Sequence, residues 1–121
     1  MGQHIGLDVS LKDTPIAIRE DGRRIWRGKC RSDPALIAKT LRKHAPEPQS
    51  VVFETGPLAT WFFHVLKGEG LPAICIEARH AQKILGETLN KTDANDAEGL
   101  ARLAETDFYK GNPPIFAGAW S

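Results

Sequence analysis

Four acidic residues of the chain have the type and spacing to act together on a phosphodiester. Asp8 and Glu54 each follow an apolar run, while Asp93 and Asp96 lie three residues apart. Carboxylates brought close together repel one another, and a divalent cation that takes oxygen ligands relieves that repulsion. Two such ions, roughly 4 Å apart, can activate a nucleophile and stabilise a leaving oxygen. The four residues are therefore candidate catalytic residues and ligands of Mg²⁺ or Mn²⁺.

Each of these residues also has an ordinary structural interpretation. Asp8 could end a strand and cap the turn after it, and Glu54 could cap a following helix. Asp93 and Asp96 would suit the first turn of a helix, where the helix dipole favours negative charge. The metal hypothesis therefore requires a fold that brings all four together.

The first 30 residues predict an antiparallel meander. Apolar residues mark strands over 5–9, 15–19 and 24–30, and Asp21-Gly22 is typical of a tight hairpin turn. Pro15 is expected at a strand start, where its missing N–H costs little.

Helices and buried strands alternate after residue 30. Ser32, Asp33 and Pro34 predict a helix start, whereas a continuous apolar run without alternation is typical of a parallel strand buried on both faces. Thr92 is expected to cap the last helix, which would place Asp93 and Asp96 on one face of its first turn. The predicted elements are a helix to residue 44, a strand over 50–53, a helix over 58–66, a strand over 73–76, a short helix over 78–85 and a helix to residue 104.

This order of elements is typical of a ribonuclease H-like α/β fold, with a mixed sheet of three antiparallel strands followed by parallel strands and flanked by helices. Such a fold puts the first strand in the middle of the sheet, beside the later parallel strand. Asp8 and Glu54 would then project from the same edge, where open α/β sheets place their sites.

Composition limits the chain to an ordinary single domain. We expect it to cover residues 1–110, with a loop or disordered tail over 111–121. A net charge of +1 excludes a strongly basic nucleic-acid-binding segment, so phosphates would have to be held locally. Candidate phosphate contacts are Lys12, Arg79, Lys83 and Lys91. Two cysteines without ligand spacing and the lack of a membrane span or signal peptide favour the cytoplasm.

Three segments carry a family resemblance. Residues 5–10, 53–56 and 91–101 resemble the three blocks of the DEDD transposases, insertion-sequence recombinases that are similar to Piv-type DNA invertases. The last block is the most specific, because Lys-Thr-Asp, a second Asp three residues on and Ala-x-x-Leu-Ala rarely coincide. Asp8, Glu54, Asp93 and Asp96 fall on the four acidic positions of that family.

The resemblance implies a RuvC-like, metal-dependent domain that cleaves and transfers DNA strands. It also implies DNA as partner, a guide RNA made by the element and assembly into homo-oligomers. In the family a helical segment and a second domain with a serine nucleophile follow this domain. The chain ends at Ser121, and Ser10, Ser32 and Ser50 lack that context, so we expect an isolated N-terminal domain or a truncated gene.

Two alternatives belong to other classes. The start of the chain also resembles the first phosphate loop of actin-like sugar kinases, although Ser10-Leu11-Lys12 is a poor phosphate cradle and 121 residues cannot hold two lobes. A catalytically silent transposase remnant is the other alternative. Mg²⁺ or Mn²⁺ binding without nucleotide would separate the transposase domain from both.

Overall fold

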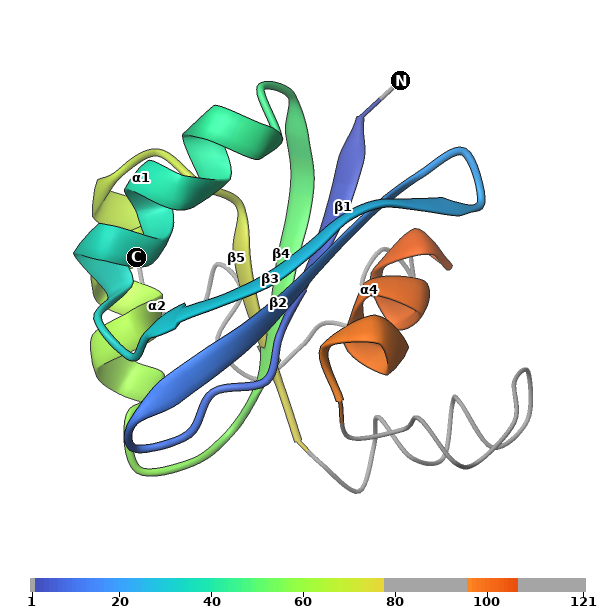
Figure 1. Ribbon diagram of the computed structural model, residues 1–121. Helices are drawn as coiled ribbons and strands as arrows, with labels where there is room; N and C mark the ends of the chain where they lie inside the picture. The colour runs from blue at the N-terminus through green and yellow to red at the C-terminus, as the bar shows by residue number, and fades with distance from the viewer. Residues whose placement is uncertain (1, 78–95, 107–121) are drawn as a thin grey trace.

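The described part of the chain is a mixed sheet with helices on both faces (Figure 1). This computed structural model describes residues 2–77 and 96–106. The sheet has five strands in the order β3-β2-β1-β4-β5, so the first strand is central, as predicted. The elements are β1 (Gln3–Leu7), β2 (Asp13–Glu20), β3 (Arg23–Arg31), α1 (Pro34–His44), β4 (Pro48–Glu54), α2 (Ala59–Gly68), β5 (Ala73–Ile76) and α4 (Ala97–Glu105).

The meander of β1, β2 and β3 is confirmed. Asp21 and Gly22 have φ values of 53° and 78°, the positive pair that a two-residue hairpin turn needs to match the twist of its strands. The predicted start of β2 was wrong, because Pro15 is the third residue of the strand. Its carbonyl accepts a hydrogen bond from the Asp8 N–H at 3.0 Å, which ties the end of β1 to β2.

Strands β4 and β5 continue the sheet in parallel. β1 pairs with β4 and β4 with β5, and residues 51–53 of β4 are fully buried. Helices α1 and α2 cover one face of this sheet (Figure 1). Their main apolar contributors to that core are Ile37, Leu41, Phe62 and Leu66.

Local signals explain where α1 and α2 begin and end. The Asp33 carboxylate caps α1 by accepting a hydrogen bond from the Ala35 N–H at 3.0 Å, and Pro34 is the first helical residue. Helix α2 ends at Gly68 and is followed, after the C-cap Glu69, by a left-handed glycine, Gly70, with φ of 85°. The N–H groups of Gly70 and Leu71 bond back to the last turn of the helix, which is the usual satisfaction of a helix C-terminus.

Helix α4 lies on the opposite face and packs on β1, β2 and β4 (Figure 1). Gly6 permits this packing, because a Cβ added there would stand 2.1 Å from the Ala97 carbonyl oxygen and 2.5 Å from the Ala101 nitrogen. Ala17 of β2 fills the same contact with Ala97 and Ala101. The helix backbone therefore lies close against the central strand.

The predicted start of the last helix was wrong. Asp96, with extended φ and ψ of −97° and 173°, is the N-cap of α4, so this helix begins after it and not after Thr92. Asp96 thus stands just before the first turn instead of within it. The predicted helix over 78–85, Thr92, Asp93 and the tail over 111–121 lie outside the described residues. No helix in the described ranges is long and apolar enough to cross a membrane.

Candidate functional site

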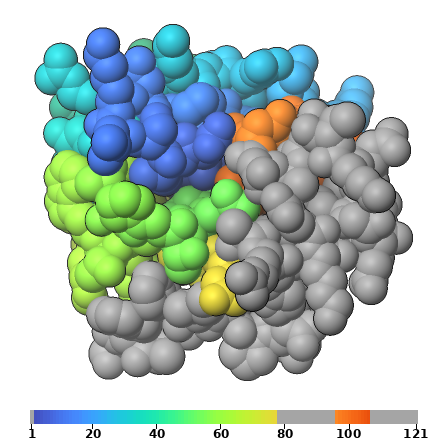
Figure 2. Space-filling model, turned by 90° about the horizontal axis from the view of Figure 1, so that it is seen from below, coloured from blue at the N-terminus to red at the C-terminus, as the bar shows by residue number. Residues whose placement is uncertain are grey.

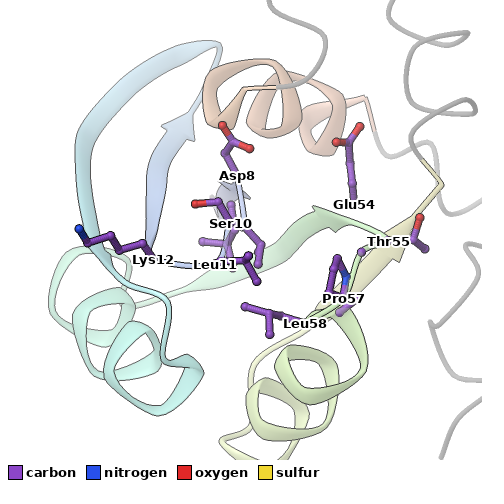
Figure 3. Close-up of a pocket in the computed structure, with 12 residues that line it drawn as sticks. Asp8, Ser10, Leu11, Lys12, Glu54, Thr55, Pro57 and Leu58 are labelled. Carbon is purple, nitrogen blue, oxygen red and sulfur yellow. The ribbon is translucent and has the colours of Figure 1, made fainter.

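Asp8 and Glu54 leave adjacent strands at the same level of the sheet. Leu7, the last residue of β1, is in register with Phe53 of β4. Asp8 directly follows Leu7, and Glu54 directly follows Phe53. Figure 3 shows both side chains pointing to the side of the sheet where α4 lies. The sequence prediction of a common edge for these two residues is met.

Burial and mutual charge act strongly on Glu54. Burial, followed by the charge of Asp8, raises the pKa of Glu54 to about 7. Its Oε2 atom is buried and has no hydrogen-bond partner in the described part of the chain. On the next strand, burial and then the charge of Glu54 raise the pKa of the Cys75 thiol to about 12. Cys75 is therefore a buried, neutral neighbour of this carboxylate in the metal-free chain.

Asp8 links Glu54 to the start of α4. Burial and then the charge of Asp96 raise the pKa of Asp8 above its ordinary value. Asp96 is exposed, and its Oδ1 accepts a hydrogen bond from the Gly99 N–H at 2.8 Å. The capping interpretation of Asp96 is therefore correct, and the same side chain still adds negative charge beside Asp8.

These carboxylates interact in pairs through Asp8. Among residues 2–77 and 96–106, no three His, Cys, Asp or Glu side chains are grouped so that they could hold a metal ion. The fourth predicted ligand, Asp93, lies outside these ranges, as do the predicted phosphate contacts Arg79, Lys83 and Lys91. Metal binding by the four carboxylates thus stays a prediction.

Two hollows meet at Asp8. One, of about 480 Å³, lies between the loop after β1 and the loop after β4 and is lined by Asp8, Lys12 and Glu54 among mostly apolar residues. Lys12 is exposed, and its side chain points away from the carboxylates (Figure 3). In Figure 2 the blue residues after β1 and the green residues after β4 adjoin on the face seen from below. The other hollow, of about 610 Å³, lies beside α4 and contains Asp8, Asp96 and arginines.

Comparison with known proteins identifies the family. Residues 5–114 match the sequence profile of a family described as Transposase, the DEDD transposases of the IS110 type. The chain belongs to this family. No curated protein matches the sequence significantly. The family match covers all three segments on which the resemblance rested, so the sugar-kinase alternative is no longer needed.

Among solved structures, this DEDD transposase chain is similar to RuvC from T. thermophilus, a structure described as a complex with a Holliday junction substrate. The TM-score is 0.55 at 12% sequence identity, and the likeness covers 95% of this chain and 100% of that chain. The likeness shows the fold. The predicted RuvC-like, ribonuclease H-like mixed sheet is confirmed.

Sequence reasoning missed the residues that hold α4 of the transposase domain in place. Arg19 of β2 donates to Glu105 at 2.6 Å and also to Glu98, and Arg24 lies 3.5 Å from Glu98. Burial lowers the pKa of Arg19, but the hydrogen bonds to Glu105 and Glu98 outweigh it and leave the pKa raised. No short-range pattern joins residues so far apart. Gly6, by contrast, had a readable signal, because a glycine inside a strand indicates close backbone approach.

Proposed function

We propose that this chain is the metal-binding catalytic domain of its transposase and works on phosphodiester bonds of DNA. Asp8, Glu54, Asp93 and Asp96 are the proposed ligands, and Mg²⁺ or Mn²⁺ is the proposed cation. The family and the RuvC-like fold support a DNA-cleaving transposase domain. The metal ligands and the details of strand transfer are the parts that the proposal adds.

The observation that carries the proposal is the unbalanced charge at Glu54. Two other partly buried carboxylates of the described chain, Glu98 and Glu105, pair with Arg19. Asp8, Glu54 and Asp96 have no such partner among the described residues, and Glu54 Oε2 is buried without a hydrogen bond. A carboxylate oxygen left in this state fits a hard cation, which prefers oxygen ligands.

The positions of three of the proposed ligands, Asp8, Glu54 and Asp96, support this function. Glu54 ends β4 directly after the buried residues 50–53, and Asp8 interacts electrostatically with both Glu54 and Asp96. Asp96 is held by its cap on α4, and α4 is held against Gly6 and Arg19. Bound divalent ions would neutralise the carboxylates, activate the attacking oxygen and stabilise the leaving one. The residues themselves orient the ligand oxygens and keep the negative charge concentrated at one edge.

The nucleophile is proposed to come from a second domain, as the family resemblance implies. The serines of the described chain are engaged locally: Ser10 with the Asp13 carbonyl, Ser32 with Thr14 at 2.8 Å, and Ser50 with His4 at 3.0 Å. Ser32 and Ser50 are buried, so neither hydroxyl is open to a phosphodiester, even though Ser50 lies beside the His4 ring. Ser10 contacts only a backbone carbonyl, which cannot act as a general base. DNA as substrate, a guide RNA encoded by the element, homo-oligomer assembly and a cytoplasmic location complete the proposal.

Manganese binding and DNA cleavage together test this function. We expect the chain to bind Mn²⁺ in solution, measured by electron paramagnetic resonance, and we expect Asp8→Asn to abolish most of the binding. With element-end DNA we expect no covalent 5′-phosphoserine link and little or no nicking. Absence of Mn²⁺ binding would instead support the silent remnant. Efficient, Asp8-dependent nicking would contradict the need for a second-domain serine and indicate a self-sufficient nuclease.

A further inference from the structure

Strand β3 carries a row of cations on one face of the sheet edge. Arg27, Lys29 and Arg31 are exposed and alternate with the less exposed Trp26, Gly28 and Cys30. Alternate residues of a strand point to the same face and are roughly 7 Å apart. Such spacing is comparable with the separation of successive phosphates along an extended nucleic-acid strand.

The cations face the same side of the sheet as the candidate site. Trp26 stacks on His44 of α1 with ring centroids 4.1 Å apart, so the residues that alternate with it point to the α4 face. Arg27 is in register with Ala17, which packs against α4. Lys29 is in register with Pro15, whose carbonyl bonds to the Asp8 N–H. Lys29 therefore lies level with Asp8, two strands or roughly 10 Å away.

Two adjoining hollows lie between the carboxylates and the cations Arg27 and Lys29. The hollow beside α4 contains Asp8 and Asp96 at one end and Arg24 and Arg27 at the other. A further hollow continues along β3 between Arg27, Lys29 and Pro15. In the described part of the chain, the surface between the carboxylates and the row of cations is therefore hollowed, and no described side chain fills it.

The three cations of the row are not neutralised by carboxylates of the described chain. Arg24, which a register shift after Ile18 turns toward α4, is 3.5 Å from Glu98. Arg27, Lys29 and Arg31 form no ion pair with any described residue, although Asp13 stands opposite Arg31. With a net charge of only +1 over the whole chain, three unpaired cations on one strand face are a local concentration.

We propose that Arg27, Lys29 and Arg31 bind the phosphate backbone of the DNA strand whose scissile phosphate lies at Asp8 and Glu54. This inference rests on the proposed function for the position of the scissile phosphate. The contacts would be independent of base sequence, because guanidinium and ammonium groups on phosphates position a strand without reading it. The row would hold nucleotides next to the cleaved bond and fix the direction in which the strand crosses the sheet.

DNA binding without catalysis tests the proposal separately from the metal site. Fluorescence anisotropy with labelled single-stranded and duplex DNA, in EDTA, compares wild type with the double variant R27Q/K29Q. The control is K39Q/K43Q, which removes the same charge from two exposed positions of α1 on the other face. We expect roughly a tenfold loss of affinity for R27Q/K29Q at 0.1 M salt and a shallower salt dependence, by about 1.4 for single strands. The control should bind within twofold of wild type.

Several outcomes would overturn the proposal. Wild type that does not bind DNA at low salt, equal losses in both variants, or no loss in R27Q/K29Q would each reject it. Self-association of R27Q/K29Q with unchanged DNA affinity would assign the cations to protection of the sheet edge instead. A strong preference for RNA of the same sequence would reject DNA as the ligand. The variant Arg27→Lys, which keeps the positive charge, should keep the affinity of wild type.

Discussion

Helices α1 and α2 cover one face of the sheet with large apolar side chains, whereas α4 lies on the other face with its backbone against Gly6. The first face buries Phe53, Phe62 and other large residues in one core. The second contact is thin at Gly6: it includes Ala17, Ala97 and Ala101, with the buried Leu100 and Leu103 also on α4, and it is bordered by the ion pairs of Arg19. The thick core fixes the sheet, and the thin contact brings the start of α4 next to the end of β1. Stability and the candidate site thus depend on different faces.

Truncating the thick core should have the largest effect on stability. Phe62 is fully buried and packs with Phe53 at a centroid distance of 6.2 Å. Phe62→Ala should lower the free energy of unfolding by about 3–5 kcal/mol, the usual cost of removing a buried aromatic side chain. Urea unfolding measures the loss. Because the carboxylates are on the other face, the stabilisation by Mg²⁺ should stay as in wild type; its loss would show that the faces are coupled.

A methyl group added at the thin contact should lower the free energy of unfolding less than Phe62→Ala does, but it should weaken metal binding more. Gly6→Ala places a Cβ against the backbone of α4, so we expect about 2–3 kcal/mol of destabilisation from overpacking and a weaker metal response as Asp96 moves from Asp8. Gly68→Ala is the control, since nothing lies within 4 Å of its added Cβ and alanine favours a helix. If Gly6→Ala matched wild type in both urea unfolding and metal response, the close approach would have no importance.

The ion pairs beside the thin contact should have a smaller effect. Arg19→Met leaves Glu98 and Glu105 without their main partner, and we expect a loss of about 2 kcal/mol in the free energy of unfolding. Arg42→Met removes a more exposed pair with Glu69 and should change stability by less than about 1 kcal/mol. Equal losses in urea unfolding would mean that burial does not distinguish the two pairs.

The pH dependence of the metal-free chain should show the smallest effect. Glu54 has a pKa of about 7 in the folded chain against an ordinary 4.5, so the folded state binds more protons between these values. Stability should therefore be highest below this window and fall as pH rises through it to about 7, by about 1 kcal/mol after solvent screening. Glu54→Gln should flatten the curve obtained from thermal unfolding at several pH values. An equally steep fall in Glu54→Gln would assign the effect to other groups.

Local patterns predicted the fold well because its elements are separated by strong signals. Asp21-Gly22, Asp33-Pro34 and the apolar run before Glu54 each determine their element by neighbouring residues alone. The prediction failed at the start of α4, where Thr92 and Asp96 both satisfy the pattern of a helix cap. Asp96 caps the helix that packs on Gly6, and that packing depends on contacts far along the chain.

The candidate site was only partly predictable for the same reason. Asp8 and Glu54 could be placed together, since parallel strands end at one edge of a sheet. The ion pairs of Arg19 join residues about 80 positions apart, and sequence spacing carries no information on them. The row of cations on β3 was readable as period-two alternation, but the near-neutral total charge concealed it.

Metal-linked stability is the most direct test of the central claim that the carboxylates beside α4 hold divalent cations. The measurement is the free energy of unfolding with and without Mg²⁺ for wild type, Asp8→Asn and Asp21→Asn, a matched charge change in the exposed hairpin turn. Wild type and Asp21→Asn should gain about 2.7 kcal/mol at a hundredfold excess of Mg²⁺ over its dissociation constant. Asp8→Asn should gain little and be at least as stable as wild type without metal, because repulsion is relieved. Equal gains in all three proteins would contradict the claim.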